Sequence, residues 1–270
     1  PMSLMKIIHA AMQSLSAKPS HACKRQRVSE HGLVRQFFGA LTAVLMVLTN
    51  AASHSAAASD EVDLELVLAV DASGSVDNAE YRLQLSGIAT ALRDPAVLRA
   101  IKAGPHKRIA LNVLIWAEAR RPKDETGWFI LSSRAEVDRV AAVIATMPRN
   151  QVGGTGIGDG VAHAIRSIDE NAIRSDRRIV DVSGDGRETP PRQYSTVLSE
   201  ARSMAIARNV TLNGLAILNE DKQLDDYYRA RLAVGDGNFV EVAEDYDDFA
   251  RAMRRKLLRE IDPDPIVGLR

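Results

Sequence analysis

Short apolar segments alternate with amphipathic segments along most of this chain, and this alternation limits the folds open to it. Residues 62–70 (VDLELVLAV) pass from an alternating start into an uninterrupted apolar run, which is typical of a strand buried on both faces. Residues 81–92 then carry apolar side chains at helical spacing. Strand-like and helical segments follow one another in this way to about residue 260. Strands linked by helices form βαβ units, which predicts a mostly parallel sheet.

The periodicity predicts six strands and a set of connecting helices. The strands are expected at residues 62–70, 109–116, 128–131, 179–182, 211–217 and 238–243. The helices are expected at residues 77–92, 133–147, 157–168, 197–204 and 247–259. No helix fits between the second and third strands, so this link indicates one antiparallel edge strand. We therefore expect an α/β fold that is doubly wound and Rossmann-like, with a mostly parallel six-stranded sheet and helices on both faces.

The first 58 residues differ from the rest and are expected to be a leader that contains a signal peptide. They hold six basic residues and one acidic residue, and an apolar run at residues 37–49 precedes the small residues that end at Ala58. A basic flank, an apolar centre and an Ala-rich exit are typical of a secretory signal, with cleavage near Ala58 and translation beginning near Val34. The run is shorter than the roughly 20 residues that a membrane span needs. We expect an exported protein, periplasmic or secreted, with no stable membrane span after cleavage.

The remaining residues, 59–270, are expected to form a single domain whose core covers residues 62–260. The whole chain balances 35 Lys and Arg residues against 35 Asp and Glu residues, which argues against a protein that binds nucleic acid. The one cysteine, Cys23, lies in the leader. The mature domain therefore has no thiol for catalysis, for zinc binding or for a disulfide.

Five oxygen-bearing side chains fall where the strands of such a sheet end. Asp71, Ser73 and Ser75 follow the first strand, Thr155 lies in a Gly-rich loop, and Asp185 follows the fourth strand. Ligands of open α/β sheets gather at the carboxyl ends of the strands. Serine and glycine after a strand are also ordinary turn residues, and Asp71 could cap the next helix. The presence of all three groups at suitable places favours a site for Mg²⁺, with Mn²⁺ and Ca²⁺ as alternatives.

These segments resemble a known motif. The Asp-x-Ser-x-Ser, Gly-Gly-Thr-Gly-Ile and Ser-Gly-Asp-Gly segments, in this order and strand context, are similar to the metal-ion-dependent adhesion site of von Willebrand factor A (VWA) domains, and in particular to those of exported bacterial proteins. The resemblance implies that Ser73, Ser75 and Thr155 coordinate the ion through their hydroxyls. It also implies that Asp71 and Asp185 hold the waters of the ion or bind it directly.

The resemblance implies a metal-dependent protein-binding module for adhesion or assembly at the cell envelope, and not an enzyme. A Glu or Asp of a partner protein would complete the coordination of the ion. Glu188, or Glu118 after the second strand, is a candidate to fill that position within the chain itself.

Two other functions stay open at this point. The first is a metal-dependent phosphoester hydrolase, although Ser73 stands where a phosphoaspartate hydrolase needs its second acid. The second is a structural VWA-like module that binds no metal. Separately, Asp181 lies inside an apolar strand, where a structural hydrogen bond is a better expectation than a metal contact.

Overall fold

The computed structural model describes residues 60–190 and 193–262. The predicted leader, its apolar run at residues 37–49 and Cys23 lie outside the described residues. Among the helices that the structure describes, none is long and apolar enough to cross a membrane.

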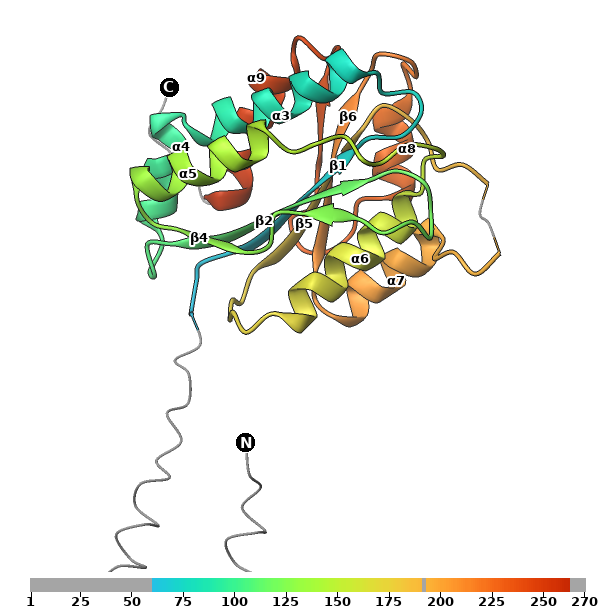
Figure 1. Cartoon of the computed structure of the whole chain (residues 1–270). Coiled ribbons are helices and arrows are strands. Elements are labelled where there is room, and N and C mark those ends of the chain that lie inside the picture. The colour runs from blue at the N-terminus through green and yellow to red at the C-terminus, as the bar shows by residue number, and fades with distance from the viewer. Residues whose placement is uncertain (1–59, 191–192, 263–270) are drawn as a thin grey trace, which may run out of the picture. The chain divides into compact units, whose positions relative to one another are not determined.

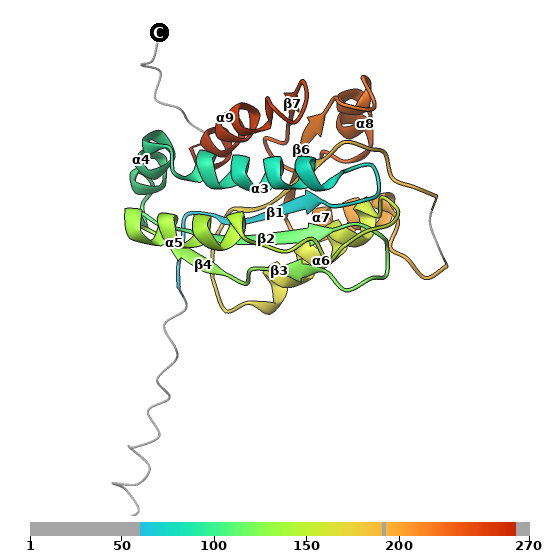
Figure 2. The ribbon, with the colours of Figure 1, turned by 45° about the horizontal axis from the view of Figure 1, so that its top comes forward.

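A seven-stranded sheet forms the centre of the described domain (Figure 1). The strand order is β3-β2-β1-β5-β6-β7, and β4 also pairs with β2. Neighbours among the five longer strands run parallel, whereas β3 and β4 pair antiparallel with β2 (Figure 2). The strands are β1 (Glu65–Asp71), β2 (Ile109–Trp116), β3 (Asp124–Glu125), β4 (Phe129–Leu131), β5 (Arg178–Gly184), β6 (Thr211–Ile217) and β7 (Val240–Ala243).

The predicted fold class is confirmed: the sheet is mostly parallel, one edge is antiparallel, and helices cover both faces. The sheet has one strand more than expected because the chain after β2 pairs back in two short pieces, β3 and β4, instead of one. Two helices, α4 and α8, were not predicted. The helices are α3 (Asn78–Leu92), α4 (Pro95–Ala103), α5 (Arg134–Ala145), α6 (Ile157–Glu170), α7 (Leu198–Ala207), α8 (Leu224–Arg231) and α9 (Phe249–Ile261).

Each face of the sheet has its own apolar core. Helices α3, α4, α5 and α9 pack on one face, and α6, α7 and α8 pack on the other. Strand β1 is buried along its whole length, with Leu66 and Leu68 in the first core and Val67 and Ala69 in the second. Successive side chains of a strand point to opposite faces, so both sets must be apolar. This explains the uninterrupted apolar run at this strand.

A group of buried ionisable residues fastens α9 to the sheet. Lys256 is fully buried, and its Nζ lies 3.1 Å from Asp181 Oδ1 of β5 and 2.6 Å from Glu260 Oε1. Asn213 Nδ2 of β6 donates a hydrogen bond of 2.8 Å to the same Glu260 oxygen. Asp181 is therefore held by an ion pair instead of the expected hydrogen bond, and neither of its carboxylate oxygens has a hydrogen-bond partner among the described residues. Burial raises the pKa of Asp181, the charge of Lys256 opposes this rise, and the charge of Glu260 adds to it.

We predict that Lys256→Met lowers the free energy of unfolding by about 3–5 kcal/mol, because it leaves two buried carboxylates without their cation. Urea unfolding at neutral pH measures this change. Arg229→Met is the matched control, since Arg229 is half exposed where it pairs with Asp225, and it should cost less than about 1 kcal/mol. Equal losses in the two variants would show that the buried group does not hold α9.

Candidate metal site

The five predicted residues come from three loops that meet at one edge of the sheet. Asp71 is the last residue of β1, and Asp185 directly follows β5, the parallel neighbour of β1. Thr155 lies just before α6. Because parallel strands end at the same edge, the fold brings these segments together as expected.

Four of the five residues are joined by short contacts. The Ser73 amide donates a hydrogen bond of 2.7 Å to Asp71 Oδ1, and Ser75 Oγ donates one of 2.6 Å to Asp185 Oδ1. The Oγ atoms of Ser73 and Ser75 lie 3.3 Å apart. The turn after β1 and the end of β5 are therefore linked through Ser75.

Thr155 borders the same space. A Cβ atom built on Gly186 would lie 3.8 Å from Thr155 Oγ1 and 3.9 Å from Ser75 Oγ, so both hydroxyls face the position above Gly186. The Thr189 amide also donates a hydrogen bond of 3.0 Å to the Thr155 carbonyl, which joins the loop after β5 to the Gly-rich loop. The Thr155 and Ser75 hydroxyls thus border the same point beside Gly186, and Ser75 links this point to Ser73 and Asp185.

The site combines two buried carboxylates with hydroxyl groups that differ in their exposure to solvent. Asp71, Ser73 and Asp185 are fully buried, Thr155 is 8% exposed, and Ser75 is exposed. Burial raises the pKa of Asp71 to about 7, the neighbouring charge of Asp185 adds to the rise, and hydrogen bonds from Ser73 oppose it. Two neighbouring buried acids are stabilised by a cation between or beside them.

The chemistry of these residues fits a hard divalent cation. Asp71 Oδ2 is buried and has no hydrogen-bond partner within the described residues. Residues 60–190 and 193–262 hold no group of three or more His, Cys, Asp or Glu side chains that could bind a metal. Oxygen-only donors with few carboxylates suit Mg²⁺ better than softer metals.

Several supporting residues escaped the sequence analysis. Tyr246 donates a hydrogen bond of 3.0 Å to Asp185 Oδ2, and Gln84 Nε2 donates one of 2.9 Å to the Asp71 carbonyl. Arg149 Nη2 donates to the carbonyls of Ser73, at 3.1 Å, and of Val76. These contacts hold the carboxylates and the turn in place. Of these residues, only Arg149 could have been suspected from the sequence, because it lies just before the Gly-rich loop.

The two acids that are candidates to complete the site from within the chain both bind backbone amides. Glu188 accepts hydrogen bonds from the amides of Gly158, at 2.8 Å, and Leu198, at 3.0 Å, near the starts of α6 and α7. Glu118 Oε2 accepts one of 3.1 Å from the Gly154 amide. Both carboxylates therefore brace the loops that carry the site.

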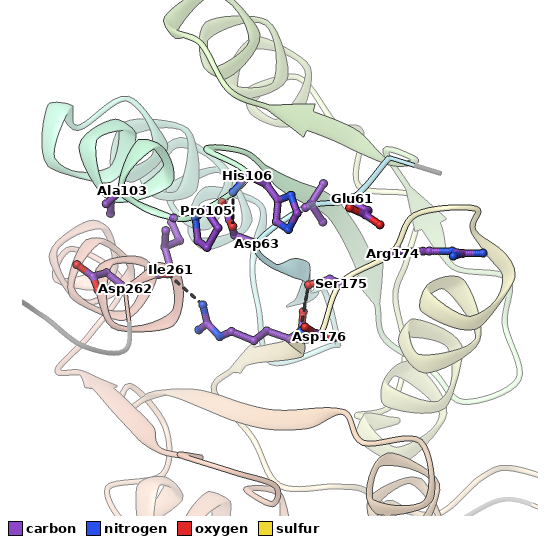
Figure 3. A pocket seen from close by; sticks show the side chains of 14 residues that line it. Glu61, Asp63, Ala103, Pro105, His106, Arg174, Ser175, Asp176, Ile261 and Asp262 are labelled. Atoms are coloured by element: carbon purple, nitrogen blue, oxygen red, sulfur yellow. Dashed lines mark hydrogen bonds between the residues drawn. The ribbon is translucent and has the colours of Figure 1, made fainter. Parts of the chain in front are cut away.

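A hollow of about 600 Å³ lies at the opposite edge of the sheet, before the first residues of β1 and β5 (Figure 3). Asp63 in this hollow accepts hydrogen bonds from the backbone amides of His106, at 2.8 Å, and Arg108, at 3.3 Å. The Arg174 side chain points away from the other labelled residues in Figure 3. The hollow contains none of the five predicted residues, so we do not assign the site there.

Residues 61–265 match a protein-family model described as "Protein of unknown function (DUF1194)". The chain belongs to this family. A search of curated proteins gave no significant match.

Solved structures with similar folds are VWA-type proteins. The pilus adhesin SpaC from Lactobacillus rhamnosus GG has a TM-score of 0.53 at 11% identity, over 75% of this chain and 31% of SpaC. The mussel byssus protein PTMP1, solved with a zinc-occupied MIDAS motif, has a TM-score of 0.52 at 16% identity, over 74% of this chain and 48% of PTMP1. The vWF domain of the pilus tip protein Mfa5 from Porphyromonas gingivalis has a TM-score of 0.51 at 9% identity, over 77% of this chain and 98% of that domain.

This DUF1194 chain therefore spans less than half the length of SpaC and of PTMP1. At such low identities the likeness shows the fold alone.

We predict that Gly184→Ala disturbs the site, because its Cβ would lie only 2.8 Å from both Asp71 Oδ2 and the Tyr228 hydroxyl. The expected loss is about 1–3 kcal/mol of unfolding free energy, the usual cost of an extra methyl in a packed region. Urea unfolding of the metal-free protein measures it. Gly186→Ala is the control, since its Cβ meets neighbours only at ordinary contact distance, and it should stay within about 0.5 kcal/mol of wild type. A Gly184→Ala protein as stable as wild type would contradict this geometry.

Proposed function

We propose that this protein is a metal-dependent protein-binding module of the cell envelope that serves adhesion or assembly. Ser73, Ser75, Thr155, Asp71 and Asp185 would hold one Mg²⁺ ion. The observation that supports the proposal is the proximity of residues with three hydroxyls and two carboxylates, which come from the turn after β1, the Gly-rich loop before α6 and the end of β5.

The donor set explains why a partner is needed. Three of the five side chains are neutral hydroxyls, so the protein supplies few negative charges to a dication. When bound, the ion supplies an electrophilic centre that a carboxylate ligand can complete. A Glu or Asp side chain of a partner protein is the expected ligand.

The exposure of the site supports an approach from outside. Ser75 is exposed and Thr155 keeps a small exposed fraction, whereas Asp71, Ser73 and Asp185 lie beneath them. The two acids considered as ligands from within this chain, Glu118 and Glu188, accept hydrogen bonds from backbone amides. This arrangement favours a carboxylate from another molecule.

Export agrees with this function, because a predicted signal peptide precedes the domain and the mature domain has no cysteine. The phosphoester hydrolase considered above gains no support, since Ser73 stands at the place of the acid that such a reaction needs.

We predict that Mg²⁺ or Mn²⁺ raises the melting temperature of the wild-type protein. A ligand at a hundred times its dissociation constant stabilises the fold by about 2.7 kcal/mol, which corresponds to roughly 5–10 °C for a domain of this size. Ser73→Ala combined with Ser75→Ala should abolish the rise, because it removes two ligands. Ser199→Ala combined with Ser203→Ala, on α7 and away from the site, should keep it.

The same variants test the binding of a partner. Crosslinking from an envelope fraction should capture proteins with wild type in Mg²⁺, and it should lose them in chelator or with the Ser73 and Ser75 double variant. A wild-type protein whose melting temperature is unmoved by millimolar Mg²⁺ and Mn²⁺ would refute the proposal and favour a metal-free structural module.

A further inference from the structure

The two site carboxylates each lie near a buried tyrosine from the last third of the domain. Tyr246, in the segment between β7 and α9, donates a hydrogen bond of 3.0 Å to Asp185 Oδ2. Tyr228, on α8, is fully buried, and its hydroxyl lies beside Gly184, as Asp71 Oδ2 does. The Tyr246 contact is a hydrogen bond in the structure, whereas no hydrogen bond joins Tyr228 to Asp71 Oδ2.

The Tyr228 hydroxyl and Asp71 Oδ2 face each other across Gly184. A Cβ atom built on Gly184 would lie 2.8 Å from each of these oxygens, so both border the same point. Each oxygen is buried, and neither has a hydrogen-bond partner within the part of the chain that the structure describes. A phenol can donate a hydrogen bond and a carboxylate can accept one, so the two groups are complementary.

The sheet is shaped to admit the Tyr228 side chain. A Cβ atom on Gly214 of β6 would lie 2.7 Å from Tyr228 Cδ2, and one on Gly184 of β5 would meet its hydroxyl. The two glycines lie on neighbouring strands and leave room for Tyr228. Gly214 makes room for the edge of the ring, and Gly184 makes room for the hydroxyl. A tyrosine that only filled the core would not need its hydroxyl directed at a buried acid.

We propose that Tyr228 is a positioning residue of the metal site, whose hydroxyl donates a hydrogen bond to Asp71 Oδ2 and fixes this carboxylate in the metal-bound protein. The inference rests on the proposed function. Tyr228 and Tyr246 would then act as a pair, one for each carboxylate. Hydrogen bonds of this kind orient metal ligands, and their loss commonly weakens metal binding about 10–100-fold.

The test is Tyr228→Phe, which keeps the ring and removes the hydroxyl. Calorimetric titration with Mg²⁺ should show binding about tenfold weaker than in wild type. The metal-free melting temperature should stay the same or rise, because the lost hydroxyl had no partner among the described residues. Tyr194→Phe is the matched control, because Tyr194 is 81% exposed, and it should bind Mg²⁺ as wild type does.

The outcomes separate this inference from the proposed function. If wild type binds Mg²⁺ and Tyr228→Phe binds it equally well, the role of Tyr228 is refuted while the metal site stands. A variant with lower metal-free stability and unchanged Mg²⁺ affinity also refutes the role, since Tyr228 would then be structural only. If wild type itself does not bind Mg²⁺, both proposals fail.

A second measurement applies even if Tyr228→Phe does not fold. Fixing the phenol on a carboxylate alters its ultraviolet absorption, so Mg²⁺ should produce a tyrosine difference spectrum in wild type. The spectrum should persist in Tyr194→Phe. A wild-type protein that binds Mg²⁺ without any change in tyrosine absorption would overturn the inference.

Discussion

The arrangement of this site depends on two fully buried carboxylates at the ends of adjacent parallel strands. Asp71 ends β1 and Asp185 follows β5, and their negative charges repel each other away from water. Such a pair is costly unless hydrogen bonds and a cation offset it. The hydrogen-bond donors around the two carboxylates offset only part of this cost, and Asp71 Oδ2 has no hydrogen-bond partner among the described residues. A divalent cation bound by nearby hydroxyls would offset the rest of the cost of burying these charges.

The surrounding loops hold this arrangement through the backbone. Arg149 binds the carbonyls of the turn after β1, and Glu188 binds amides near the starts of α6 and α7. Thr189 ties the loop after β5 to the Gly-rich loop. The ligands are thus positioned by contacts among three loops, while the parallel sheet sets the distance between the strands that carry them. Rigid placement of this kind is what a binding site requires.

The sequence could predict features that depend on local pattern. Strands β2 and β6 have the expected bounds, because continuous apolar runs with clear ends mark strands buried on both faces. Helix α8 was missed because it buries only Leu224 and Tyr228 within a charged segment, which leaves no apolar stripe to detect. The five candidate ligands were found through motif and topology together.

The contacts of Tyr228, Tyr246 and Arg149 could not be predicted in the same way. They join residues far apart in the chain with no recurring spacing, for example Arg149 with the turn at Ser73 and Val76. Which tyrosine meets which carboxylate depends on how α8 and the segment before α9 pack on the sheet. Gly184 and Gly214 make this packing possible, and their role appears only once neighbouring strands are placed side by side.

A crystal structure of the protein grown with Mn²⁺ tests the central claim most directly, because the anomalous signal of the metal locates it without prior assumptions. The account predicts one strong peak beside Asp71 and Asp185, with the hydroxyls of Ser73, Ser75 and Thr155 within bonding distance, about 2.0–2.1 Å in the corresponding Mg²⁺ form. A peak elsewhere, or a Thr155 hydroxyl turned away from the metal, would contradict it.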